Sequence, residues 1–288
     1  MPFHGWQIQP NGISVQEVLQ KGLSTILRKD IEVVGAGRTD TGVHARTMVA
    51  HFDCDLQLDC PQTAYRLNRI MPPTIAIRKM ERVSDDMHAR FSAKSRTYHY
   101  YVHTEKDPFL RHYSYRTPYA LDFDMMNKAA EILMEYEDFG AFCKSNSDAK
   151  TTICHVTAAR WHQVSETSWY FEITANRFLR NMVRAVVGTL VDVGRGRLTL
   201  DGFRRVIEEG KRTSAGESMP GNALFLEKMG KQYLCVKARG LHAFLLKVLL
   251  CPFEYPAYRP DFVICHILFH LFQPFCLVCR DKGVEDFL

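Results

Sequence analysis

An acid between a cation and a run of small residues is the feature of this sequence best suited to chemistry. The eleven residues Gly35-Ala-Gly-Arg-Thr-Asp-Thr-Gly-Val-His-Ala45 place the carboxylate of Asp40 two residues after Arg38. The apolar stretch 31–34 precedes them and predicts a strand that ends at a glycine turn. Enzymes can expose a nucleophile at such a turn, because glycine adopts positive φ angles and lets a substrate come close. An ionised carboxylate there can attack carbon or stabilise a cationic sugar.

Two phosphate-binding motifs and a turn cap compete with this catalytic interpretation. A dinucleotide fingerprint requires Gly-x-Gly-x-x-Gly, and its sixth position is Asp40 here, whose charge would repel a pyrophosphate. Gly37 and Gly42 have the spacing of a phosphate-cradling loop. However, Val43 and His44 stand where that motif needs lysine and serine or threonine. An aspartate can also simply cap a turn, so the residue pattern alone leaves the catalytic and capping interpretations open.

Five motifs in the same order resemble the tRNA pseudouridine synthase A family. They run from residue 3 to residue 188, within a resemblance that continues to residue 228: Phe3-His-Gly-Trp-Gln-Ile-Gln-Pro10, Gly37-Arg-Thr-Asp-Thr-Gly-Val-His-Ala45, Phe91-Ser-Ala-Lys-Ser-Arg-Thr-Tyr-His-Tyr100, Asp138-Phe-Gly-Ala-Phe-Cys143 and Phe178-Leu-Arg-Asn-Met-Val-Arg-Ala-Val-Val-Gly188. The resemblance implies an isomerase that converts uridine to pseudouridine in the anticodon stem-loop of tRNA, at positions 38–40. This chemistry needs no cofactor and no metal.

The resemblance also implies roles for four residues. Asp40 matches the family's nucleophile, and Arg38 is expected to be a local cation and a phosphate contact. Arg184 is expected to orient the Asp40 carboxylate, because an arginine fork holds a carboxylate bidentately. Tyr98, the first tyrosine of the motif Arg-x-Tyr-x-Tyr, is expected to stack on the uracil. Attack on C1′ of the ribose, attack on C6 of the base and loss of a C2′ proton all remain open.

Other polar residues have simpler interpretations. His44 is expected to shape the turn through a hydrogen bond rather than act as a general base. The spacing of His44, His51, Asp53 and Cys54 matches no known ligand set, so no metal is expected. RNA contacts are expected from basic residues around the site, each of which could equally be a solvated charge: Arg46, Arg66, Arg69, Arg78, Arg90, Lys94, Arg96, Arg177 and Arg180.

Hydrophobic spacing and capping residues predict the elements that must position this site. Helices are predicted over residues 15–29, 61–71, 123–136, 178–193 and 201–209, the first with a capping box from Ser14 to Glu17. Strands are predicted over residues 31–36, 46–52, 75–80, 98–103, 152–161, 169–175 and 223–227. Together with the resemblance, this order predicts an α/β (α+β) fold. Two ferredoxin-like, RRM-like halves would join their antiparallel sheets, with the catalytic cleft between them.

Three segments follow from this prediction. Residues 1–104 form the N-terminal half with Asp40, and residues 105–229 form the C-terminal half. Family chains carry a strand ahead of the Gly-Trp-Gln segment, which the N-terminal half is expected to lack. Residues 230–288 form an apolar, cysteine-rich tail that is atypical of the family and is interpreted as non-native; a membrane segment over 262–279 or zinc at Cys276 and Cys279 are the alternatives. Its removal is expected to change synthase function little.

Composition is compatible with this assignment. The 288 residues are 46% hydrophobic, which is sufficient for one large or two smaller cores. A net charge of +5 suits an RNA partner. The first residues lack a signal-peptide pattern and the nine cysteines lack a framework spacing, so a reduced, cytoplasmic protein is expected. The resemblance adds a homodimer without membrane association, and an inactive RNA-binding remnant of the same family is the alternative function.

Overall fold

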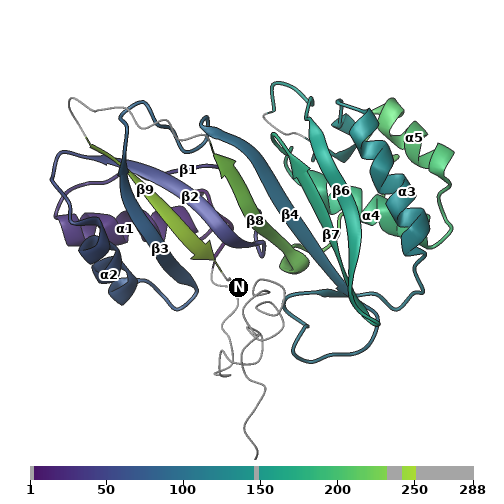
Figure 1. The fold of residues 1–288 in the computed structure, drawn as a ribbon, viewed down its shortest axis with the longest axis horizontal. Coiled ribbons are helices and arrows are strands. Elements are labelled where there is room, and N and C mark those ends of the chain that lie inside the picture. The colour runs from purple at the N-terminus through teal and green to yellow at the C-terminus, as the bar shows by residue number, and fades with distance from the viewer. Residues whose placement is uncertain (1–2, 146–148, 232–241, 251–288) are drawn as a thin grey trace, which may run out of the picture. The chain divides into compact units, whose positions relative to one another are not determined.

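A mixed β-sheet runs through the described part of the chain. A computed structural model describes residues 3–145, 149–231 and 242–250. Its strands are β1 Val34–Gly35, β2 His44–Cys54, β3 Ile75–Val83, β4 Ala93–His103, β5 Tyr115–Arg116, β6 Val156–Ser165, β7 Ser168–Ala175, β8 Leu224–Lys231 and β9 His242–Leu250. The order across the sheet is β3-β9-β2-β8-β4-β7-β6 (Figure 1), with β1 paired to β2 and β5 to β4. The sheet is mixed because β2 and β8 run parallel, whereas the other neighbours in this order are antiparallel.

The helices lie close to their predicted positions. They are α1 Val15–Leu27, α2 Cys60–Ile70, α3 Phe123–Ile132, α4 Met182–Gly194 and α5 Leu200–Glu209. The Ser14 side chain accepts a hydrogen bond from the backbone N–H of Glu17 at 3.2 Å, which caps α1 as predicted. The helix predicted to reach residue 136 ends earlier, and its last residues form a 3-10 turn, Leu133–Glu135. Further 3-10 turns span Gly140–Phe142 and Gly221–Ala223.

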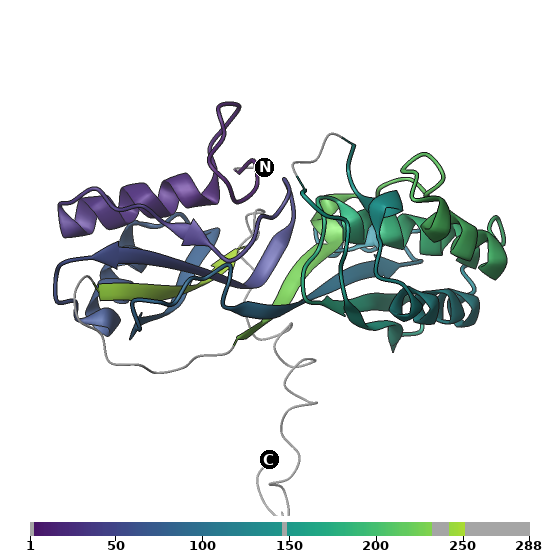
Figure 2. The ribbon, with the colours of Figure 1, turned by 90° about the horizontal axis from the view of Figure 1, so that it is seen from above.

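Two clusters of buried side chains lie on the same face of the sheet. In the first, α3, α4 and α5 pack on β4, β6 and β7 around Trp161 and Phe171. In the second, α1 and α2 pack on β2, β3 and β9 around Phe52. Leu224 of β8 belongs to the first cluster and Leu226 to the second, and residues two apart on a strand point to the same face. Figure 2 accordingly shows α1, α4 and α5 on the same side of the strands.

All described residues belong to one compact unit, Met1–Phe253. The α/β fold class is therefore confirmed as a mixed sheet covered by helices. The finer division into two ferredoxin-like domains stays a prediction, and so do its boundaries. The membrane and zinc interpretations of the tail concern residues 262–279, which lie outside the described residues.

Strand β9 lies between β2 and β3 and is antiparallel to both. Its pairing with β2 runs from Leu250 opposite Ala45 to His242 opposite Cys54. On its other side it pairs with all of β3. The side chains of Leu246 and Val248 are 0% and 1% exposed and lie in the second cluster. Nine residues of the predicted tail thus form an inner strand of the sheet.

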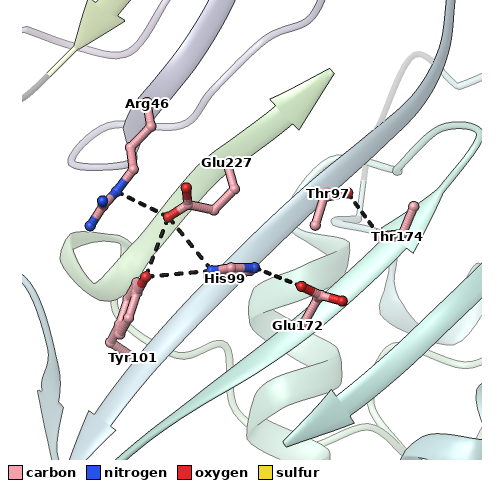
Figure 3. A network of polar contacts seen from close by, with 7 residues as sticks. All are labelled: Arg46, Thr97, His99, Tyr101, Glu172, Thr174 and Glu227. Carbon is pink, nitrogen blue, oxygen red and sulfur yellow. Dashed lines mark hydrogen bonds and ion pairs between the residues drawn. The ribbon is translucent and has the colours of Figure 1, made fainter. Parts of the chain in front are cut away.

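The opposite face of the sheet carries a polar network (Figure 3). Glu227 of β8 lies 3.0 Å from Nε of Arg46 on β2 and accepts a hydrogen bond from the Tyr101 hydroxyl at 3.3 Å. His99 of β4 lies between two carboxylates, with Nε2 at 3.0 Å from Glu172 and Nδ1 at 3.6 Å from Glu227. The network therefore connects β2, β8, β4 and β7 on the side of the sheet away from the two clusters.

Candidate active site

The loop that carries Asp40 is held by backbone contacts on two sides. The N–H of Trp6 donates to the carbonyl of Thr39 at 3.2 Å. Gly5 precedes it with φ +85°, and a Cβ at this position would lie 2.4 Å from the Thr39 carbonyl oxygen, so only glycine fits. On the other side, a Cβ on Gly221 would lie 2.8 Å from the carbonyl oxygen of Thr41. The loop is therefore packed between the Gly-Trp-Gln segment and the turn before β8.

An ion pair joins Asp40 to Arg184. The guanidinium Nη1 lies 3.5 Å from Oδ2 of Asp40, and the two side chains are 23% and 31% exposed. Arg184 is in α4, and its Nε donates to the carbonyl of Met219, whose own N–H donates to the carbonyl of Arg184 at 3.1 Å. The contacts with Met219 thus fix the guanidinium, while its Nη1 faces the carboxylate of Asp40. The carboxylate remains partly open to solvent and accessible to a substrate.

Of the two tyrosines in the motif Arg-x-Tyr-x-Tyr, Tyr98 is the better candidate for a contact with the substrate. Its ring packs edge-to-face on Phe178, with centroids 5.2 Å apart. Burial raises the pKa of Tyr98 to about 12, and the charge of Asp40 acts in the same direction, so the phenol is protonated at neutral pH. Tyr100, two residues along the same face, is fully buried and donates its hydroxyl to the carbonyl of Pro220 at 3.0 Å. Tyr98 is therefore the more available of the two tyrosines.

Arg38 is not the residue that forms the salt bridge to Asp40 among the described residues, so its expected role as a local cation stays a prediction. Its side chain is exposed, and the salt bridge to Asp40 comes from Arg184 instead. Two of the residues expected to contact RNA also have other partners: Arg46 pairs with Glu227 on the opposite face, and Arg96 binds backbone carbonyls. Arg180, just before α4, is exposed, and its contact with RNA stays a prediction.

Comparison with known proteins identifies the family. Residues 129–230 match a family model described as tRNA pseudouridine synthase. The tRNA pseudouridine synthase A of Bacteroides thetaiotaomicron is 58% identical over 226 residues, 78% of this chain and 84% of that protein. The enzyme of the same name from Bacillus subtilis is 39% identical over 228 residues, 78% of this chain and 92% of that protein. The chain belongs to the tRNA pseudouridine synthase A family. It is therefore a pseudouridine synthase, an isomerase, as the five motifs predicted.

The candidate site includes residues whose part the sequence did not reveal. Trp6 holds the Asp40 loop and Phe178 packs on Tyr98, and each lies in a motif that was quoted only for its resemblance. Their place in these motifs is the only sequence signal that could have marked them. Within the described ranges, no three His, Cys, Asp or Glu side chains are grouped as a metal site. Nor is any helix there long and apolar enough to cross a membrane.

His44 anchors the end of the loop that carries Asp40. Its Nε2 donates to the carbonyl of Asn222 at 3.0 Å, and the carbonyl of His112 lies at 3.3 Å. The ring stacks on Phe225 with centroids 4.3 Å apart. Burial lowers the pKa of His44 to about 4, so the ring is neutral at neutral pH. These contacts agree with a residue that shapes the turn.

This histidine should make the protein less stable in mild acid. The unfolded chain binds a proton at His44 below about pH 6.5, whereas the folded chain does so only near pH 4, so stability falls across that window and no further below it. Between pH 7 and pH 5 the loss from this residue should be about 2 kcal/mol. Urea unfolding of the unmutated chain and of His44→Asn at both pH values measures it. Equal pH dependence in the two proteins would contradict this account.

Proposed function

We propose that this chain isomerises uridine to pseudouridine in the anticodon stem-loop of tRNA, at positions 38–40, with Asp40 as the nucleophile. The observation that carries the proposal is the partly exposed carboxylate of Asp40 held in an ion pair with Arg184. Its relatives at 58% and 39% identity bear the name tRNA pseudouridine synthase A. An anionic side chain in this setting fits a reaction that passes through an electron-poor sugar or base.

The reaction conserves all atoms. The bond from C1′ of the ribose to N1 of the uracil breaks, the base turns, and C5 bonds to C1′. C5 then loses its proton and N1 gains one. Asp40 can act by bonding to C1′ as the uracil leaves, by bonding to C6, or by assisting loss of a C2′ proton. In each route Arg184 holds the carboxylate in one orientation, which lowers the entropic cost of reaching the transition state.

Tyr98 would hold the base rather than act as a phenolate. Because burial keeps its hydroxyl protonated, it offers an aromatic face and an O–H donor to the detached uracil. The edge-to-face contact with Phe178 fixes the plane of this face. A base must leave its stack to reach such a residue, and stacking on an aromatic ring offsets part of that cost.

Exposed arginines would bind the RNA backbone. Arg38 precedes Asp40 by two residues and Arg180 lies just before α4, which carries Arg184, so each is close in sequence to one member of the ion pair. Their guanidinium groups suit phosphate oxygens. Binding through such contacts should weaken as salt is raised.

The working form would be a cytoplasmic homodimer. In the described part of the chain, neither cluster places a helix on the face with the Arg46–Glu227 pair, and this face presents partly buried rings such as Tyr170 and Tyr101, 5.7 Å apart. It carries both signs of charge, so a second copy turned about a two-fold axis can match it. Sedimentation velocity should give twice the chain mass of 33.2 kDa. The Tyr170→Glu variant should sediment as a monomer.

Mapping the modified positions tests the function. Unmodified tRNA transcripts with uridine at position 38, 39 or 40 are incubated with the chain, treated with carbodiimide and alkali, and read by primer extension. Stops at these positions, and none when the uridine is replaced by cytidine, are the expected result. Stops elsewhere in the tRNA would refute the stem-loop assignment. Binding of tRNA without any stop would instead indicate the inactive remnant.

A further inference from the structure

Arg96 uses its guanidinium to join three backbone segments: the loop at Ala36, the stretch from Arg90 to Ala93, and the turn at Asn176. Nη1 donates to the carbonyl oxygens of Ala93 at 2.9 Å and Asn176 at 2.6 Å. Nη2 donates to those of Ala36 and Arg90, both at 3.1 Å. Four of the five N–H groups of an arginine are thereby used on main-chain oxygens. This side chain was expected to contact RNA, but its donors are already occupied inside the protein.

Two of these three segments adjoin the proposed site residues Asp40 and Tyr98. Ala36 begins the loop that carries Asp40, and its own N–H donates to the carbonyl of Val49 at 2.8 Å. With both its N–H and its carbonyl bonded, Ala36 fixes the start of the loop. Asn176 is two residues before Phe178, whose ring packs on Tyr98. One guanidinium therefore connects the segment before the acid to the segment that holds the base-facing ring.

The position of Arg96 in the sheet suits this task. It is two residues before Tyr98 on β4, so both side chains leave the same face of the strand. Burial lowers the pKa of Arg96, and the nearby charges of Arg90 and Arg177 act in the same direction. Among the described residues, its hydrogen bonds go to backbone carbonyls and no salt bridge to it is found. A cation that is held at some cost in solvation and that bonds to main-chain carbonyls is a fixed structural part of the site.

We propose that Arg96 is a positioning residue of the synthase, which fixes the Asp40 loop relative to Tyr98 without touching the RNA. This inference rests on the proposed function of Asp40. Lysine has one nitrogen and cannot bond to all four carbonyls at once, so Arg96→Lys should act in the same direction as a larger truncation but less strongly. Loss of the link should displace the loop by a fraction of an ångström to an ångström, which is enough to slow catalysis about a hundredfold.

The test compares Arg96→Ala, Arg96→Lys and the unmutated full chain in single-turnover assays with tRNA labelled with tritium at C5 of uridine. Tritium released to water reports the lost C5 proton. The rate constant should fall about a hundredfold in Arg96→Ala and about tenfold in Arg96→Lys, while the dissociation constant for tRNA stays within about threefold. Millimolar guanidinium should restore part of the rate to Arg96→Ala and none to Asp40→Asn. Arg205→Ala, an exposed arginine on α5, is the matched control and should behave as the unmutated chain.

Weakened tRNA binding with an unchanged rate constant would show that Arg96 contacts RNA and would overturn the proposal. An unchanged rate in Arg96→Lys together with no rescue by guanidinium would overturn it as well. If Arg96→Ala does not fold, Arg96→Lys decides, because it keeps the cation and most of the side chain. Failure of the proposed function looks different: the unmutated chain would release no tritium, or Asp40→Asn would release it at the full rate.

Discussion

Replacing Asp40 with asparagine should abolish pseudouridine formation while the protein stays folded and binds tRNA. Asparagine has the same shape but no charge, so it cannot bond to C1′ or C6 or stabilise a cationic sugar. Removal of a nucleophile typically lowers the rate constant by at least about ten-thousandfold. Arg184 would lose its anionic partner but keep its contacts with Met219, so α4 should be undisturbed. Tritium release from C5-labelled tRNA measures the rate, and filter binding measures the affinity.

Asp53→Asn is the matched control for this prediction. Asp53 is an exposed residue of β2, beyond the loop that carries Asp40. Its replacement by asparagine therefore makes the same chemical change away from the site. Its rate constant should equal that of the unmutated chain. Turnover by Asp40→Asn within tenfold of the unmutated chain would refute the assignment of the nucleophile. A variant that is inactive because it no longer binds tRNA would assign Asp40 to binding instead.

Shortening Leu246 to alanine should lower the free energy of unfolding by about 3 kcal/mol. Leu246 is fully buried in the second cluster, so the change leaves a cavity between β9 and the helices. Most domains have only 5–15 kcal/mol of stability in total, so this loss is large. Leu246→Asp should prevent recovery of soluble protein, because it places a charge among apolar side chains. Urea unfolding, with activity measured in parallel, is the assay.

Val164→Ala serves as the control for the β9 prediction. Val164 is 61% exposed on β6, so the same kind of truncation there should change stability by less than about 0.5 kcal/mol. Equal stability of Leu246→Ala and the unmutated chain would show that β9 is not an inner strand. Removal of residues 230–288 should also destabilise the protein strongly, because both β2 and β3 lose their shared partner.

Local sequence signals were sufficient for most of the elements. Ser14, Asp122 and Thr199 each cap a helix through the side-chain bond that such residues favour. The strand predicted over 31–36 is shorter, because side chains of α1 accept hydrogen bonds from its backbone. The N–H of Ile31 donates to the Ser24 hydroxyl, and the N–H of Val33 donates to the Gln20 side chain. Only Val34–Gly35 then pair with β2. This competition depends on how a helix packs on the strand, which hydrophobic periodicity does not encode.

The long-range features could not be predicted in the same way. The pairing of β9 with β2 joins residues some two hundred positions apart, such as Leu250 and Ala45. The pattern of apolar residues in 242–250 does not indicate which strands this segment pairs with, and the match to the family model ends at residue 230. The role of Arg96 depends on four carbonyls from three separate segments, and a carbonyl has no sequence signature. Asp40, Tyr98 and Arg184 were found because they lie in motifs, and their roles remain proposals.

The ion pair between Asp40 and Arg184 has a practical consequence. The acid lies between elements of the second cluster, and its arginine is on α4 of the first. Neither cluster alone holds both partners. A cut in the connector between β5 and α3, near residue 120, would divide the ion pair between two polypeptides, and it would also separate β8 and β9 from their partner strands β2, β3 and β4. Each fragment would be inactive alone, and recovered pseudouridine formation would report that the two fragments had reassembled.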